Sequence, residues 1–140
     1  MSIKLYEFAT VMFFIALSAG CGGSNCSVTG TVTFPDGSPL TEGEVLFESP
    51  VLMSKGVIQK NGTYAMSTGE LKGVPKGTYQ VTISVPMEQV ISSGIEGKPP
   101  TIIPLDIPIA RKFFSPATSG LTCEVKGRTK YDIKVEAPEK

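Results

Sequence analysis

The chain has 140 residues, a length typical of one domain and too short for separate cofactor and substrate modules. Its 13 Lys and Arg residues balance 13 Asp and Glu residues, so it has no excess positive charge for binding a nucleic-acid backbone. The sequence contains no His, which removes the usual base of Ser and Cys nucleophile sites and the commonest metal ligand. We therefore expect no nucleic-acid partner, no metal site and no cofactor.

An apolar segment follows Lys4 near the start of the chain. Residues 8–19 (FATVMFFIALSA) carry no charge and end in small side chains. As a helix, these twelve residues would reach about 18 Å, well short of the roughly 30 Å hydrocarbon core of a bilayer. The pattern is typical of an export signal rather than of a permanent membrane span.

The segment ends in residues 17–21, Leu-Ser-Ala-Gly-Cys, which resemble the lipobox of bacterial lipoproteins. The resemblance implies that a signal peptide of residues 1–20 is removed and that Cys21 becomes a lipidated first residue. Residues 21–26 would then be the acylated terminus and a short linker. Because each buried methylene contributes about 0.8 kcal/mol, two or three acyl chains such as palmitate anchor firmly. An ordinary secretory leader and an uncleaved anchor are the alternatives.

The lipoprotein resemblance also predicts a location. It places the chain in the cell envelope, lipid-anchored to a membrane and facing the periplasm or the surface. By analogy with the family, the absence of Asp after Cys21 favours the outer membrane.

From Cys26 onward the sequence alternates apolar and polar residues with period two, which predicts strands. Turn residues separate seven such runs, and no long amphipathic helical repeat is present. The predicted strands are residues 27–34, 44–49, 55–59, 63–68, 78–85, 121–126 and 131–136. We expect an all-β domain, a seven-stranded antiparallel β-sandwich.

Short turn sequences separate several of these strands. Asp36 precedes a glycine, and we interpret it as a turn residue rather than a calcium ligand, because the spacing of a calcium loop is missing. The Asn61-Gly62 pair predicts a type I′ hairpin turn that pairs residues 63–68 with residues 55–59. Residues 127–130 are expected to join the last two strands as a hairpin.

Regular alternation fails between residues 86 and 116. Six prolines remove ladder donors there, so a continuous central strand is excluded and one long Pro-rich loop is expected. Loops of this length are usually functional or mobile. The apolar residues of its second half predict packing over the sandwich; they are Ile102, Ile103, Leu105, Ile107, Ile109, Phe113 and Phe114.

Four motifs occur in order at residues 28–32, 36–43, 61–64 and 73–81: Val-Thr-Gly-Thr-Val, Asp-Gly-Ser-Pro-Leu-Thr-Glu-Gly, Asn-Gly-Thr-Tyr and Gly-Val-Pro-Lys-Gly-Thr-Tyr-Gln-Val. Together they resemble the carboxypeptidase regulatory-like domain, a transthyretin-like (prealbumin-like) sandwich. The tail, residues 107–122, is similar to the ending of small bacterial lipoproteins that carry one such domain. The resemblance implies a non-catalytic domain over residues 27–136 and provides no catalytic residues.

Two cysteines, Cys26 and Cys123, remain beside the lipidated one. Both are in phase with inward-facing strand residues, in a compartment that permits disulfides. A bridge between them would close a long loop and stabilise the domain by about 4 to 5 kcal/mol. Two buried free thiols that pack as small apolar groups are the equal alternative.

Arg111, Lys112, Phe113 and Phe114 follow one another at the end of the long loop. They suggest a cationic and aromatic contact patch, although Phe pairs of this kind are more often core residues. The acidic residues are scattered over turns and solvent faces, so no general acid and base pair is visible.

These features predict a membrane-tethered, non-catalytic module of the cell envelope that binds glycan, peptidoglycan or a protein partner. One alternative is a small-molecule hydrolase of transthyretin-like type, which the absence of His argues against. Another is an accessory subunit that binds a partner strand at an open sheet edge.

Overall fold

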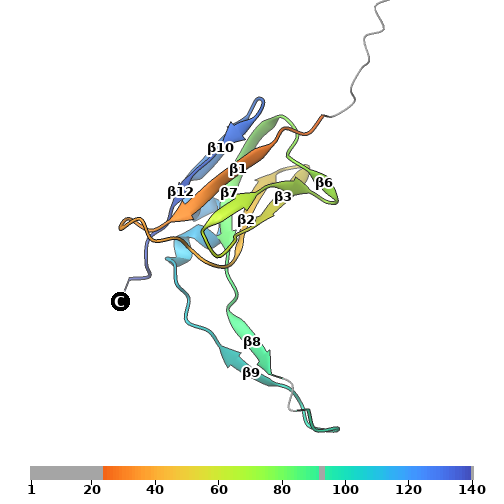
Figure 1. The fold of residues 1–140 in the computed structure, drawn as a ribbon, viewed down its shortest axis with the longest axis vertical. Coiled ribbons are helices and arrows are strands. Elements are labelled where there is room, and N and C mark those ends of the chain that lie inside the picture. Colours follow the sequence, from red (N-terminus) through yellow and green to blue (C-terminus); the bar gives the residue numbers. More distant parts are fainter. Residues whose placement is uncertain (1–23, 92–93, 140) are drawn as a thin grey trace, which may run out of the picture.

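The computed structural model describes residues 24–91 and 94–139 and is mostly β-structure, as predicted. The predicted signal peptide and Cys21 lie outside the described residues. Figure 1 shows two sheets stacked into one body, from which a separate hairpin projects. The body strands are β1 (Val28–Thr33), β2 (Glu44–Ser49), β3 (Leu52–Val57), β4 (Thr63–Ala65), β5 (Ser67–Thr68), β6 (Leu71–Lys72), β7 (Gly77–Ser84), β10 (Leu121–Val125), β11 (Thr129–Lys130) and β12 (Ile133–Lys134).

The smaller sheet of the body, here the β1 sheet, has β1 at its centre. β4 pairs antiparallel with one edge of β1, with Gly30 opposite Tyr64. β11 and β12 pair parallel with β1, at Val28 opposite Thr129 and Val32 opposite Ile133. The prediction of a wholly antiparallel arrangement is therefore wrong at β1, because the last strands run alongside the first one in the same direction.

The larger sheet, here the β7 sheet, has the order β10-β7-β2-β3-β5-β6, and all its pairs are antiparallel. β10 lies beside β7, with Cys123 opposite Tyr79. The expected hairpin between the last two strands is wrong, since β10 belongs to the β7 sheet and β11 and β12 to the β1 sheet. The residues between them cross from one sheet to the other.

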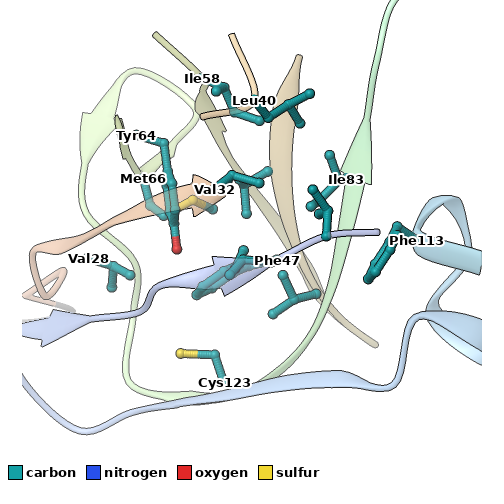
Figure 2. Close-up of a cluster of buried hydrophobic side chains, with 14 of the residues drawn as sticks. Val28, Val32, Leu40, Phe47, Ile58, Tyr64, Met66, Ile83, Phe113 and Cys123 are labelled. Carbon is teal, nitrogen blue, oxygen red and sulfur yellow. The ribbon is translucent and has the colours of Figure 1, made fainter. Parts of the chain in front are cut away.

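One hydrophobic core holds the two sheets together (Figure 2). The β1 sheet contributes side chains such as Val32, and the β7 sheet contributes Phe47 and Ile83, all fully buried. The Phe47 ring meets the Tyr131 ring edge-on, with 6.0 Å between ring centroids. Such aromatic pairs add about 0.5 to 1.5 kcal/mol beyond the burial of their area. The inward positions of the predicted alternation thus form the core.

The segment after Asn61-Gly62 divides between the two sheets. Thr63–Ala65 pairs with β1, whereas Ser67 pairs with Lys55 of β3, so the chain changes sheet at Met66. The predicted single partner strand for residues 55–59 is therefore wrong. The turn also differs from type I′. A type I′ turn would need a positive φ at Asn61 as well as at Gly62, but only glycines among the described residues have a positive φ. The turn runs from Gln59 to Gly62 and is closed by the Gly62 N–H, which donates to Gln59 O. Gly62 itself has a φ of 81°.

The long segment of residues 86–116 contains regular structure. β8 (Glu88–Ile91) and β9 (Thr101–Pro104) form an antiparallel hairpin that stands away from the body (Figure 1). The helical turns η1 (Arg111–Phe114) and α1 (Pro116–Ser119) follow and lie against β7. The expected packing of the second half holds for Ile109 and Phe113, which are buried, whereas Ile102 and Ile103 are exposed.

The helices of the structure are short. Among the described residues, none has the length and apolar composition needed to cross a membrane.

Candidate functional site

A groove of about 600 Å³ opens at one edge of the body, where β4 of the β1 sheet meets β3 of the β7 sheet. Hydroxyl, amide and ammonium groups share its walls with a few apolar side chains. We call it the lysine groove; its lining is Thr29, Gly30, Thr31, Lys55, Val57, Gln59, Thr63, Tyr64, Ala65, Ser67 and Lys130. No carboxylate is part of this lining.

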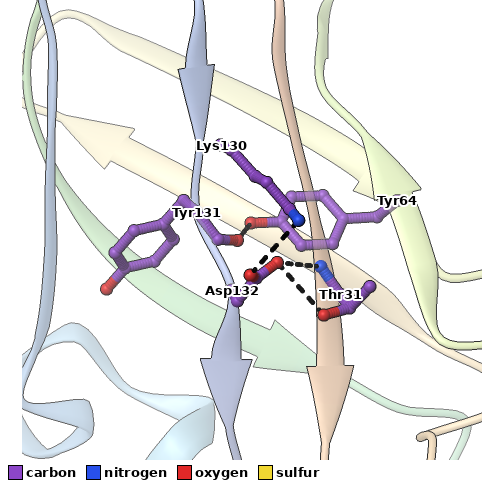
Figure 3. A network of polar contacts seen from close by, with 5 residues as sticks. All are labelled: Thr31, Tyr64, Lys130, Tyr131 and Asp132. Atoms are coloured by element: carbon purple, nitrogen blue, oxygen red, sulfur yellow. Dashed lines mark hydrogen bonds and ion pairs between the residues drawn. The ribbon is translucent and has the colours of Figure 1, made fainter.

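Asp132 lies outside this lining but hydrogen-bonds to Thr31, which belongs to it (Figure 3). Its Oδ1 accepts two hydrogen bonds from Thr31, from the backbone N–H at 3.0 Å and from Oγ1 at 3.1 Å. Pairing between β1 and the C-terminal strands is interrupted here, between Thr29 opposite Lys130 and Val32 opposite Ile133. The carboxylate therefore accepts the N–H that a backbone carbonyl would accept in a continuous ladder.

Tyr64 forms the floor of the same region. Its phenol donates a hydrogen bond to the backbone carbonyl of Tyr131, across β1 (Figure 3). Burial is the main cause that raises the pKa of the Tyr64 phenol, with Cys123 next, so the group stays neutral. Gly30 lies between these two residues, and a Cβ there would be 1.9 Å from Tyr131 O. Only glycine fits at this position.

Two lysines give the groove its positive charge. Lys55 Nζ lies 3.5 Å from Glu44 Oε1, and Lys130 Nζ lies 3.8 Å from Asp132 Oδ2. Both ammonium groups are largely exposed, and such surface ion pairs contribute little energy. Each lysine can therefore exchange its carboxylate partner for a ligand oxygen.

Hydroxyl groups complete the polar surface. Thr63 donates its backbone N–H and its Oγ1 to Asn61 Oδ1, at 3.1 and 2.7 Å, which fixes the rotamer of Thr63. Ser67 Oγ donates to Lys55 O at 3.3 Å. The remaining lone pairs of these hydroxyls and the free lysine protons can bind a ligand rich in hydroxyl, amide or carboxylate oxygens.

The described residues contain no group of three or more His, Cys, Asp or Glu side chains that could hold a metal ion. Hydrogen bonds from the Ser38 hydroxyl and backbone N–H lower the pKa of the Asp36 carboxyl group. It accepts from the Ser38 backbone N–H and Oγ, the geometry of the predicted turn.

Cys26 and Cys123 are free cysteines in the structure, and a bridge between them in the mature protein stays a prediction. Cys26 is half-buried and bridges to Val74 through its backbone, while Cys123 is buried on β10. Burial raises the pKa of the Cys123 thiol, which keeps it protonated and unreactive.

The predicted contact patch divides between core and surface. Phe113 is buried in the core and Phe114 packs partly against it, as expected of core residues. Arg111 and Lys112 are exposed. Lys112 Nζ lies 5.1 Å from the Phe113 ring centroid and 2.6 Å from Glu136 Oε2, so it ties η1 to the C-terminal segment.

The lysine groove was not predicted from the sequence. Its lysines come from β3 and β11, which are far apart along the chain and meet only because β1 and its neighbours fold over β3. The signal for the groove in the sequence was a set of outward-facing Thr residues on β1. Any half-exposed strand has such residues, so they did not indicate a binding site.

No protein-family model matches the chain, and a search of curated proteins found no significant match.

Proposed function

We propose that this protein is a membrane-tethered, non-catalytic binding module of the cell envelope and that its lysine groove binds an envelope glycan. The observation that carries the proposal is the lining of the groove, which combines hydroxyl, amide and lysine groups without a carboxylate. Glycan strands offer many hydroxyl, amide and carboxylate oxygens to such donors. The described residues offer no metal cluster, and the chain has no His.

The tether belongs to the same proposal. The lipobox-like residues 17–21 support acylation at Cys21, and the absence of Asp after Cys21 supports a place on the outer membrane. Only six residues, 22–27, separate Cys21 from the first strand of the body at Val28, so the body would stand close to the lipid surface. The two sheets around one core and the four ordered motifs support a transthyretin-like sandwich of the carboxypeptidase regulatory-like kind.

The groove is tested by titrating the protein with solubilised peptidoglycan fragments while following backbone amide shifts. We expect the shifted amides to cluster around the lysine groove. Replacing both lysines, Lys55→Ala with Lys130→Ala, should weaken binding at least about tenfold, since each charged hydrogen bond contributes roughly 1.5 to 3 kcal/mol. Lys126→Ala is the matched control, because Lys126 also pairs with a carboxylate, Glu124, at 3.4 Å but lies outside the groove.

Shifts that cluster elsewhere, or equal binding by the double variant and the wild type, would overturn the groove assignment. The tether is tested by labelling cells with radioactive palmitate. The wild type should carry label in the membrane fraction, and Cys21→Ala should carry none. Recovery of the wild type as an unprocessed, unlabelled chain would overturn the tether and leave the groove experiment unaffected.

A further inference from the structure

The β8–β9 hairpin projects from the body without a partner (Figure 1). All eight residues of its two strands are exposed, and within the described chain β8 pairs with β9 alone. Val90 and Ile102 lie opposite each other on one face, and Ile91 and Ile103 lie on the other. A two-stranded hairpin is only marginally stable in water. An arm that is apolar on both faces is therefore typical of a surface that another chain covers.

The hydrogen bonds of the hairpin fix which backbone groups point outward. Leu105 N–H donates to Met87 O at 2.8 Å, so these residues form a hydrogen-bonded pair at the base. In an antiparallel ladder such pairs alternate with pairs whose N–H and C=O groups face away from the ladder. Continuing this alternation along the observed register, the outward positions are Glu88 and Val90 on β8, and Pro104 and Ile102 on β9.

The two outer edges differ in their ability to bind a strand. On β9, Pro104 occupies an outward position and Pro100 occupies the outward position two residues before Ile102. Neither proline has an N–H, so the β9 edge is blocked. β8 contains no proline, and Glu88 and Val90 both offer an unpaired N–H and C=O. The β8 edge is open.

We propose that the β8 edge binds the β8 edge of a second copy of this chain, antiparallel, so that two hairpins form one four-stranded sheet. With Gln89 on the two-fold axis, Glu88 forms a hydrogen-bonded pair with the partner's Val90, and the reverse pair forms by symmetry. Met87, 45 % exposed, then packs against the partner's Ile91, 43 % exposed in one copy.

Three observations favour a second copy over another occupant. The pairing is self-complementary and places each Glu88 opposite an apolar residue rather than opposite the other carboxylate. The formal net charge is zero, so two copies do not repel each other at long range. Both outer edges of the resulting sheet are β9 edges, so their prolines end the assembly at two copies.

A bilayer is a poorer occupant for this hairpin. Its distal part carries Glu96 and Lys98, which a membrane-inserting tip would have to desolvate. The hairpin and the start of the described chain lie at opposite ends of the molecule (Figure 1), so the arm points away from a membrane that holds the N-terminus. The pairing itself does not depend on the proposed glycan-binding function.

The test compares proline substitutions on the two edges of the full chain, purified in detergent and studied by sedimentation equilibrium. Val90 and Ile102 lie directly opposite each other, and both N–H groups point outward. Val90→Pro and Ile102→Pro therefore each remove one outward donor without removing a bond inside the hairpin. We expect wild type and Ile102→Pro to dimerise equally and Val90→Pro to have a dissociation constant raised at least about tenfold.

A wild type that stays monomeric at every concentration overturns the proposal. So does equal weakening by both substitutions, or dimerisation unchanged by Val90→Pro, because the contact would then lie elsewhere.

A second measurement does not depend on proline tolerance. Gln89 lies on the proposed axis, where the two Cα atoms would be about 4.5 Å apart, within reach of a disulfide. Under mild oxidation Gln89→Cys should give a covalent dimer. The matched control is Ile103→Cys, opposite on β9, which should give only the background that the parent chain's own cysteines produce. Cross-linking at Ile103→Cys without cross-linking at Gln89→Cys overturns the proposed edge.

Discussion

Gly30 is the residue at which the β1 sheet depends on the absence of a side chain. Its missing Cβ would lie 1.9 Å from Tyr131 O and 2.8 Å from the Tyr64 hydroxyl oxygen. Gly30→Ala must move β1 away from one neighbour, and we expect it to lower the free energy of unfolding by about 3 kcal/mol. Denaturant titration followed by circular dichroism measures the change.

Gly127→Ala is the control for this substitution, because no atom lies within 4 Å of its added Cβ. It should change stability by less than about 0.5 kcal/mol. Equal effects of the two substitutions would show that the close approach at Gly30 does not limit the packing of β1.

The Cys123 thiol is predicted not to react with alkylating reagents in the folded protein. Burial raises the pKa of its thiol, and the reactive species is the thiolate, so alkylation needs unfolding. Iodoacetamide at pH 8 should leave Cys123 unmodified in the native protein and modify it in denaturant without prior reduction. Mass spectrometry of Cys123 peptides measures both. A thiol that reacts in denaturant only after reduction would show that the mature protein carries the bridge.

At the scale of elements, the β8–β9 hairpin contributes nothing to the core of the body. None of its strand residues is buried, and the core lies entirely outside it. Replacing residues 88–104 with a two-glycine linker should therefore change the free energy of unfolding by less than about 1 kcal/mol. The measurement is made at a protein concentration where wild type is monomeric, since dimerisation would add apparent stability. A loss of several kcal/mol would mean that the arm supports the body.

The sequence predicted individual strands better than it predicted their partners. β2 has the predicted bounds, β1 and β7 differ from prediction by one residue at each end, and β10 begins where predicted and ends one residue earlier. Their alternation is a local property, so it can be read from the chain directly. Pairing is non-local, which is why β10 was expected beside the final strands instead of beside β7.

The groove could not be predicted for the same reason. Lys55 and Lys130 belong to different sheets, and each one alone is an ordinary exposed strand residue. Asp132 likewise looked like a solvent-facing position in the alternation. Its role follows from the interrupted ladder at Thr31, which exists only because the C-terminal strands run parallel to β1.

At the scale of the whole molecule, the buried Tyr64 and Tyr79 and the half-buried Tyr131 predict how stability depends on pH. Burial is the main cause that raises the pKa of Tyr64, Tyr79 and Tyr131 above the ordinary value near 10. Below pH 10 these phenols are neutral in both states, so their contribution is fully present. Above pH 10 the unfolded chain loses protons that the folded chain retains, and stability falls.

Tyr64 alone should reduce the free energy of unfolding by about 1.4 kcal/mol for each pH unit above 10. Urea titrations at successive pH values measure the slope. Tyr64→Phe should be less stable at pH 8, because its hydrogen bond to Tyr131 is lost, yet should show a shallower decline in alkali. A wild-type stability that stays level between pH 9 and 11 would contradict the prediction.

The parallel pairing of β1 also determines when the domain can be completed. β1 can pair with β4 early, but Val28 lies opposite Thr129, so the first strand of the body finds its two parallel neighbours only after nearly the whole chain has been made. During synthesis β1 lacks these neighbours while β2, β3 and β7 are already free to pair with one another. Truncation from the carboxyl end should therefore leave an unfinished domain open along β1, a form that proteases and chaperones would recognise.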